Sequence, residues 1–316
     1  MTPRFEWRGA MLDVARHFFL PDDVKRFVDA IAALGLNRLH LHLTDDQGWR
    51  IEIESWPRLA TVGGETAVGG ARGGFYTQAE YADLVAYAAA RDVVVVPEVD
   101  LPGHVNAALV AYPELAPAGF EPRPYAGIDV GFSSLDVRNE ATYAFVDDVA
   151  RELAALTPGP YLHIGGDEAA ATKPSDYAVF IERVCEIVRA HGKQPVGWEE
   201  IAKAELAPGT IVQHWKDEDL ARTAVRKGAR LIMSPASRTY FDMKYDAGTK
   251  LGLEWAGYVS VDDARDWDPA TQVEGVAETD IVGVEGCLWS ETLETYDDLV
   301  FMAFPRLGAL AAIASG

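Results

Sequence analysis

Short apolar segments alternate with amphipathic, helix-like segments along this chain, and the alternation constrains its fold more than any other feature. Parallel strands need long crossovers, which helices usually supply, so this order predicts a parallel α/β sheet. Eight strands are the number that closes a (β/α)8, or TIM, barrel. The expected strands cover residues 11–14, 37–43, 93–97, 161–164, 194–197, 210–213, 231–233 and 281–288. The expected helices include residues 21–34, 139–156, 175–191, 218–227 and 296–313, and one that follows a Thr-x-x-Glu capping box at Thr77.

The length fits one barrel as well as it fits two average domains. The chain has 316 residues, and a barrel of this kind uses roughly 250 as one domain. We find no internal repeat and no interdomain linker. We therefore expect a single (β/α)8 domain over residues 1–316, with no room for an additional N-terminal domain. Both cysteines, Cys185 and Cys287, lie in apolar runs, which favours buried free thiols over a disulfide.

The charge and the ends of the sequence limit the partners. The net charge is −21, whereas nucleic acid and anionic membranes need a basic surface, so both are poor partners. No stretch approaches the roughly 20 apolar residues of a membrane span, and the first residues lack the apolar centre of a signal peptide. The chain as given is expected to be cytoplasmic. A trimmed secreted domain would look the same.

Polar and aromatic side chains follow six of the expected strands. In a barrel the carboxyl ends of the strands converge on one face, and that face carries the active site. Carboxylates beside tryptophans favour a carbohydrate, because sugar rings stack on aromatic faces while their hydroxyls need charged hydrogen-bond partners. The strand-end residues are Asp45, Asp46, Glu98, Asp100, His104, Asp167, Glu168, Trp198, Glu199, His214, Trp215, Trp289 and Glu291.

The segment His163-Ile-Gly-Gly-Asp167-Glu168 is the sharpest local signal. Its two glycines allow a tight turn that delivers adjacent carboxylates to the cleft. Like charge and burial can keep one of two neighbouring acids protonated, as a general acid requires. An ordinary glycosidase instead places two carboxyls on opposite sides of the bond, at least about 5 Å apart. The adjacency therefore leaves room for a mechanism in which the substrate supplies the nucleophile.

A metal site is the alternative interpretation of the histidines. His40 and His42 alternate with leucines, so both face one side of a strand, and His-x-His at a barrel strand end begins the ligand set of some metal-dependent hydrolases. Tryptophan and acid dominate the other strand ends. A hydrogen-bonded polar layer inside the barrel is therefore favoured over metal.

Four motifs, in order, resemble glycoside hydrolase family 20, and in particular bacterial β-N-acetylhexosaminidases of the actinobacterial type. They are Arg8-Gly-Ala-Met-Leu-Asp-Val-Ala-Arg-His-Phe-Phe, Leu41-His-Leu-Thr-Asp-Asp-Gln-Gly-Trp-Arg, Pro97-Glu-Val-Asp-Leu-Pro-Gly-His and His163-Ile-Gly-Gly-Asp-Glu. The likeness runs from about Arg8 to Leu310. It implies a barrel that removes terminal non-reducing β-linked N-acetylglucosamine or N-acetylgalactosamine from glycans or chitooligosaccharides, without metal or other cofactor. The mechanism that it implies is retaining and substrate-assisted, with the 2-acetamido carbonyl as nucleophile and an oxazolinium intermediate.

The resemblance also implies catalytic roles. Glu168 would be the general acid and then the base that activates water. Asp167 would hold the acetamido N–H and stabilise the developing positive charge, and Tyr240 would hydrogen-bond the acetamido carbonyl oxygen. Asp45 and His104 would lie near Glu168 and influence its protonation.

The remaining roles implied by the resemblance concern substrate binding. Trp255 would stack on the leaving sugar. Three tryptophans would enclose the acetamido methyl and the sugar: Trp198, Trp215 and Trp289. Three polar residues would bind the 3-, 4- and 6-hydroxyls: Arg8, Asp242 and Glu291.

Relatives in this family often carry a small domain before the barrel and continue beyond its last helix. By that comparison, the chain is either a minimal member or a fragment with a truncated C-terminus. Two rival functions stay open at this point. One is a non-catalytic glycan-binding barrel, which would have no need of a proton donor at Glu168. The other is a metal-dependent barrel hydrolase, which chelation would silence.

Overall fold

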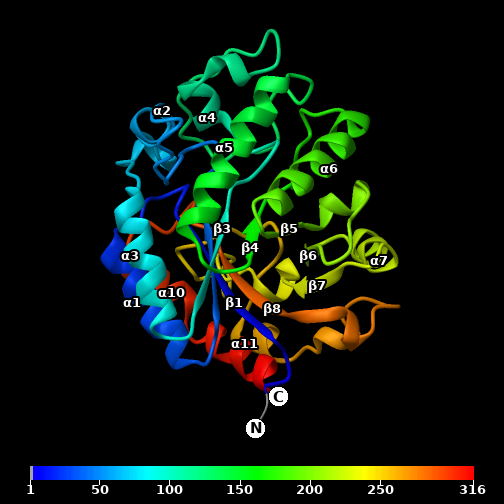
Figure 1. The fold of residues 1–316 in the computed structure, drawn as a ribbon. Helices are drawn as coiled ribbons and strands as arrows, with labels where there is room; N and C mark the ends of the chain where they lie inside the picture. Colours follow the sequence, from blue (N-terminus) through cyan, green and yellow to red (C-terminus); the bar gives the residue numbers. More distant parts are fainter. Residues whose placement is uncertain (1–2) are drawn as a thin grey trace.

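The computed structural model describes residues 3–316 and shows eight parallel strands that close a barrel in sequence order (Figure 1). Helices connect the strands and cover the outside, which confirms the predicted (β/α)8 architecture. The strands are β1 (Trp7–Asp13), β2 (Arg38–His42), β3 (Val94–Glu98), β4 (Tyr161–His163), β5 (Gln194–Trp198), β6 (Ile211–His214), β7 (Arg230–Met233) and β8 (Ile281–Leu288).

The outer helices follow the expected amphipathic patterns. In the first of them Val24, Phe27, Val28 and Ile31 are buried. Thr77 and Glu80 form the predicted capping box. The helices are α1 (Pro21–Ala33), α2 (Arg58–Thr61), α3 (Gln78–Ala89), α4 (Asn106–Ala111), α5 (Glu140–Leu156), α6 (Pro174–Ala190), α7 (Glu218–Arg226), α8 (Ala236–Thr239), α9 (Val261–Arg265), α10 (Tyr296–Ala303) and α11 (Arg306–Ser315).

The last helix differs from the prediction. A single helix over residues 296–313 was expected, but the chain forms α10 and α11 with a break between them. Pro305 lies at this break, where it lacks a backbone N–H and crowds the preceding turn. The bend lets α11 pack beneath the barrel, where the N–H of Phe5 donates to the carbonyl of Ala314 over 3.2 Å. Among residues 3–316, no single helix is long and apolar enough to cross a bilayer; α10 and α11 together have that length and composition, but they are bent by 52°.

The barrel interior has an apolar layer and a polar layer. The apolar layer consists of Trp7, Val96, Tyr161, Val196, Ile211, Ile232 and Val282. The polar layer follows from strand register, which pairs His42 with Glu98 and Glu98 with His163. Residues far apart in sequence are thereby brought together just below the carboxyl ends of the strands.

The connection between β7 and β8 is long and irregular, and one buried arginine holds it in place. The guanidinium of Arg306, in α11, donates to the carbonyls of Phe241, Met243 and Val259 over 2.5, 2.8 and 2.8 Å. Arg306 is fully buried, so these carbonyls replace water as its partners. This contact positions a connection that carries three of the predicted site residues, Tyr240, Asp242 and Trp255.

Candidate active site

A cavity of about 440 Å³ opens at the carboxyl ends of the barrel strands. Its walls come from segments that follow β1, β4, β6, β7 and β8 and from the loop between α4 and α5. This is the face on which barrel enzymes carry their chemistry. The lining residues are Arg16, Ile128, Asp129, Val130, Asp167, Glu168, Trp215, Lys216, Tyr240, Asp242, Leu253, Glu254, Trp255, Trp289 and Glu291.

The turn after β4 presents Asp167 and Glu168 to this cavity, as predicted. Gly165 has a φ of 65°, and a Cβ there would lie 1.8 Å from Oδ1 of Asp100, so a side chain is excluded on two grounds. Glu168 itself has a φ of 46°. A non-glycine residue in this region is strained, and such strain is concentrated at functional sites.

A chain of buried acids and histidines leads to Glu168. His42 Nε2 lies 2.7 Å from Oδ2 of Asp45, and His104 Nδ1 lies 3.2 Å from Oδ1 of Asp45. His104 Nε2 then lies 3.5 Å from Oε2 of Glu168 and 3.6 Å from Oδ2 of Asp167. The structure therefore places Asp45 and His104 beside Asp167 and Glu168, at the position that the resemblance implied.

The charges of these acids and histidines determine which of them are protonated. Burial opposes the charged form of His104, but Asp45 and Asp167 outweigh it and hold the His104 pKa well above its usual value. Burial likewise opposes ionisation of Asp45, yet Arg16 and His104 hold the Asp45 pKa well below normal. Burial raises the pKa of Glu168, but the neighbouring His104 and the charges of Lys216 and Arg16 lower it overall. Glu168 is thus ionised at neutral pH in the free pocket.

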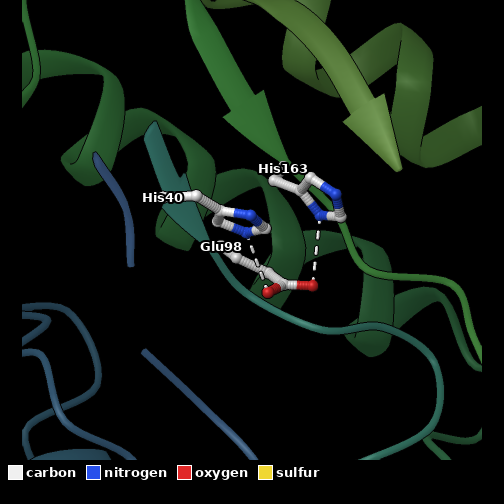
Figure 2. A group of neighbouring side chains, drawn as sticks. All are labelled: His40, Glu98 and His163. Carbon is white, nitrogen blue, oxygen red and sulfur yellow. Dashed lines mark hydrogen bonds and ion pairs between the residues drawn. The ribbon is translucent and has the colours of Figure 1, made fainter. Parts of the chain in front are cut away.

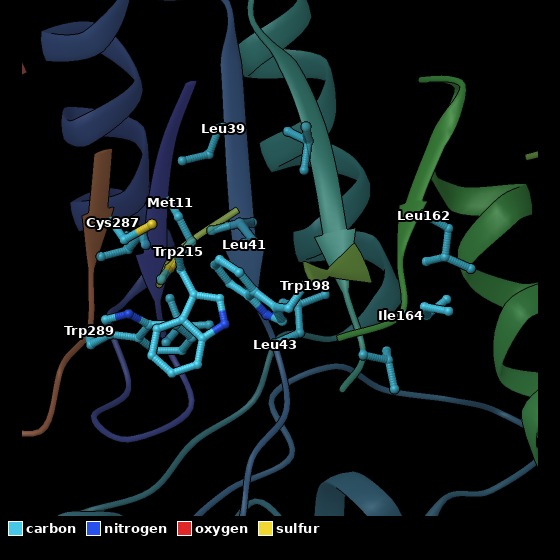
Figure 3. Packing of buried hydrophobic residues seen from close by; sticks show 14 of the residues in the cluster. Met11, Leu39, Leu41, Leu43, Leu162, Ile164, Trp198, Trp215, Cys287 and Trp289 are labelled. Atoms are coloured by element: carbon cyan, nitrogen blue, oxygen red, sulfur yellow. The ribbon is translucent and has the colours of Figure 1, made fainter. Parts of the chain in front are cut away.

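Aromatic rings form the walls of the cavity. Trp215 and Tyr240 are parallel, with an interplanar angle of 8° and centroids 6.1 Å apart. The exposed Trp255 meets both edge-on, at 5.9 and 5.8 Å, and forms the mouth. Trp289 packs 6.1 Å from Tyr240 on the inner side. Trp198, which was expected to enclose the sugar, does not line the cavity and lies behind it, 5.7 Å from Trp289 (Figure 3). Its indole N–H donates to Glu98 over 2.7 Å.

The polar end of the cavity is a group of buried charges. Asp242 is only 2% exposed, and neither of its carboxylate oxygens has a hydrogen-bond partner within residues 3–316. Burial and the neighbouring Glu291 raise the Asp242 pKa well above normal, and burial also raises that of Glu291. Unpartnered oxygens of this kind are suited to accepting or donating hydrogen bonds to sugar hydroxyls.

Arg8 is wrongly placed by the resemblance, and Arg16 occupies the pocket instead. Arg8 lies at the start of β1, and its guanidinium donates to the carbonyls of Gly35 and Phe5 at the far end of the barrel. Arg16 follows the carboxyl end of the same strand, pairs with Asp45 at 2.8 Å and lies over the ring of Trp289. The rule that barrel sites gather at carboxyl strand ends would have selected Arg16.

Other lining residues were also missed. Lys216 directly follows Trp215, and its ammonium lies 3.8 Å from the centre of that ring, so the strand-end pattern could have included it. Ile128, Asp129 and Val130 belong to a loop without a recognisable pattern. That loop reaches the cavity because Gly131 packs against the carbonyl of Glu168, where a Cβ would lie 3.2 Å away.

His40 and His42 belong to the polar layer of the barrel, in which His40 and His163 both face Glu98 (Figure 2). His40 contacts Glu285 through Nδ1 at 2.8 Å and Glu98 through Nε2 at 3.0 Å. Both nitrogens of His42 likewise face carboxylates, those of Glu98 and Asp45. Imidazole and carboxylate atoms of His40, Glu98 and His163 are close enough to hold an ion, but these contacts already use both nitrogens of His40. The geometry therefore favours the hydrogen-bonded layer over the metal interpretation.

The fold and the pocket together define a carbohydrate-active barrel with adjacent carboxylates at its centre. The family model for glycosyl hydrolase family 20, catalytic domain, matches residues 5–177 and 172–314. The β-N-acetylhexosaminidase of Cellulomonas fimi is 49% identical over 315 residues, which cover 99% of this chain and 64% of that protein. This chain belongs to glycoside hydrolase family 20.

Solved structures agree with this assignment. The family 20 β-N-acetylhexosaminidase of Streptomyces coelicolor A3(2) superimposes with a TM-score of 0.97 at 53% identity, covering 99% of this chain and 65% of that one. The N-acetyl-β-hexosaminidase of Streptomyces plicatus, in complex with Thio-NAglucal, gives 0.97 at 55% identity, covering 99% and 64%. The chain thus spans just under two thirds of the length of these relatives.

Proposed function

We propose that this domain hydrolyses terminal non-reducing β-linked N-acetylhexosamine residues with the substrate's own acetamido group as nucleophile. The observation that carries the proposal is the pair Asp167–Glu168 on one strand end, beside a box of Trp215, Tyr240 and Trp289. The two acids at the polar end of the cavity, Asp242 and Glu291, have raised pKa values, which favour neutral acids over nucleophilic anions. A Streptomyces plicatus relative is described in complex with N-acetylglucosamine as product, which supports an N-acetylated sugar as ligand.

Each group then has a chemical task. Glu168 protonates the leaving oxygen and later takes a proton from water; because it is ionised in the free pocket, a bound sugar must exclude water and raise its pKa first. Asp167 accepts the acetamido N–H and stabilises the positive charge that develops on the cyclising ring. Tyr240 donates to the acetamido oxygen from the wall of the box.

The sugar itself is held at both ends of the cavity. Arg16, Asp242 and Glu291 bind hydroxyls at the polar end, with Arg16 in the role that the resemblance gave to Arg8. Trp255, which is 54% exposed, offers a face to the leaving sugar at the mouth. The proposed partner is therefore a terminal N-acetylhexosamine of a glycan or chitooligosaccharide.

The test compares two chromogenic β-glycosides that differ only at C2. The wild-type protein should turn over the 2-acetamido substrate and barely turn over the 2-hydroxyl one, and a thiazoline mimic of the cyclised intermediate should inhibit far below the substrate KM. Asp167→Asn should weaken that inhibition and slow catalysis together, because the lost contact forms mainly in the transition state and intermediate. Glu168→Gln should lose roughly 10²- to 10⁴-fold on substrates with poor leaving groups.

The rival mechanisms give opposite results. Covalent labelling of a carboxylate by a 2-fluoro sugar, without thiazoline inhibition, would establish a protein nucleophile instead. A glycan-binding barrel would bind N-acetylglucosamine without turning over either substrate.

A further inference from the structure

Asp100, just beyond β3, is a buried acid with no role in the mechanism above. It is fully buried, and its Oδ1 accepts a hydrogen bond from the N–H of Gly166 over 2.9 Å. One of its oxygens lies within 4.8 Å of a nitrogen of His104 and of an oxygen of Asp167. Asp100 thus packs directly against the carboxylate that must face the acetamido group.

Each of the two acids has an oxygen that is left without a partner. Counting all groups in residues 3–316, neither Oδ2 of Asp100 nor Oδ1 of Asp167 has a hydrogen-bond donor. A buried polar atom without a partner is destabilising, and two facing anions would add repulsion. A single proton between the two carboxyl groups removes both problems.

The surrounding charges decide which acid carries that proton. The groups that face Asp100 are Glu98 on its own strand, His42 on β2, His104 in the following loop and Asp167 beyond β4. Burial is the main reason why the Asp100 pKa lies well above normal, and Asp167 and Glu98 add to it against the charge of His104. The pKa of Asp167 is raised as well, mainly by burial, but the charge of His104 and the neighbouring Asp100 oppose that rise, so it is smaller than the rise at Asp100. The proton therefore belongs on Asp100.

We propose that Asp100 stays protonated in the working protein and donates its proton to Oδ1 of Asp167, so that Asp167 remains an anion in a fixed orientation. Oδ2 of Asp167 is then left to accept the acetamido N–H and to face the cationic intermediate. Asp100 touches neither substrate nor reacting atoms, so it is a positioning residue. This inference rests on the proposed function.

The test uses two substitutions with opposite predictions. In Asp100→Asn the amide oxygen can still accept from Gly166 while the amide nitrogen donates to Asp167, so the protonated acid is mimicked. This variant should retain most of the turnover of the 2-acetamido substrate. Asp100→Ala removes the donor to a charged group, and kcat/KM should fall roughly 10- to 100-fold, mainly through kcat. A similar loss in both variants would show that Asp100 acts as an anion and would overturn the proposal.

A second measurement needs no substrate. The infrared difference spectrum between wild type and Asp100→Asn at neutral pH should contain the carbonyl stretch of a protonated carboxylic acid. Its absence would overturn the proposal even if Asp100→Ala fails to fold. If the wild type does not hydrolyse the 2-acetamido substrate, the proposed function fails, whereas the infrared result still decides the protonation of Asp100.

Discussion

Arg8 and Arg16 belong to one motif, but only Arg16 lies at the carboxyl end of its strand, where barrel sites form. Replacing each arginine in turn by methionine tests whether only Arg16 contributes to activity. Arg16 is 4% exposed, lines the cavity and pairs with Asp45 at 2.8 Å and with Asp13 at 3.4 Å. Methionine keeps the length of the aliphatic stem but removes the charge. Breaking a buried ion pair on one side costs about 3–5 kcal/mol, because the remaining carboxylates are left uncompensated. We expect a loss of that order in the free energy of unfolding, reduced where Asp45 or Asp13 takes up a proton.

The catalytic effect of Arg16→Met adds to this loss. A hydrogen bond from a charged group contributes about 1.5–3 kcal/mol, which corresponds to roughly 10- to 150-fold in kcat/KM if Arg16 holds a sugar hydroxyl. The assay is kcat/KM on a chromogenic β-N-acetylglucosaminide, beside urea unfolding of the same samples.

Arg8→Met is the matched control. Arg8 makes two hydrogen bonds to carbonyls at the opposite end of the barrel, so its loss should lower the free energy of unfolding by about 1–3 kcal/mol and leave kcat/KM of the folded protein near that of wild type. Equal catalytic losses in the two variants, or near-normal kcat/KM in Arg16→Met, would refute this reasoning.

Two further predictions concern the polar layer. Glu98 and Glu285 outweigh burial and raise the pKa of His40 to about 9, and Glu98 and Asp45 raise that of His42 to about 10. Because both values lie above the unfolded value of about 6.5, this stabilisation is complete below pH 6.5 and is lost as pH rises through 9–10. Urea unfolding should show a loss of roughly 3 kcal/mol from His40 alone, and a constant stability between pH 6.5 and 10 would contradict the assignment. Prolonged EDTA treatment should leave activity unchanged, since carboxylates already face both nitrogens of His40 and His42; a loss that zinc specifically reverses would restore the metal interpretation.

The barrel could be predicted from sequence because its signals are local. The apolar run at residues 281–288 and the capping box at Thr77 depend on near neighbours, and both appear in the structure where they were expected. The helix over residues 296–313 was wrong because its apolar pattern continues across Pro305, whose effect on the backbone outweighs that pattern.

The site was predictable where it follows a strand and unpredictable where long-range packing forms it. Asp167, Glu168, Trp215 and Trp289 follow strands, and the structure places all four in one cavity. Ile128 reaches the same cavity only because its loop packs against the backbone of Glu168 through Gly131, a contact that no local pattern encodes.

The misplaced Arg8 shows a different limit. The motif contains two arginines eight residues apart, and a motif alone does not say which end of the strand faces the substrate. The direction of β1 through the barrel distinguishes them, because it places Arg16, and not Arg8, at the end that carries the cavity.

The buried charges in the centre of the barrel are connected to the cavity. From Glu285 the contacts run through His40, Glu98, His42, Asp45 and His104 to Glu168 without leaving the protein interior. Apolar residues of similar volume could often replace such buried charges at no cost in stability. They could not hold His104 as a cation beside Glu168, because that charge depends on Asp45, whose ionisation depends in turn on Arg16 and His104. The protonation of Glu168 is therefore set by groups that extend down to the second strand, and a substitution at His40 should alter the charge of the pocket as well as the packing of the barrel.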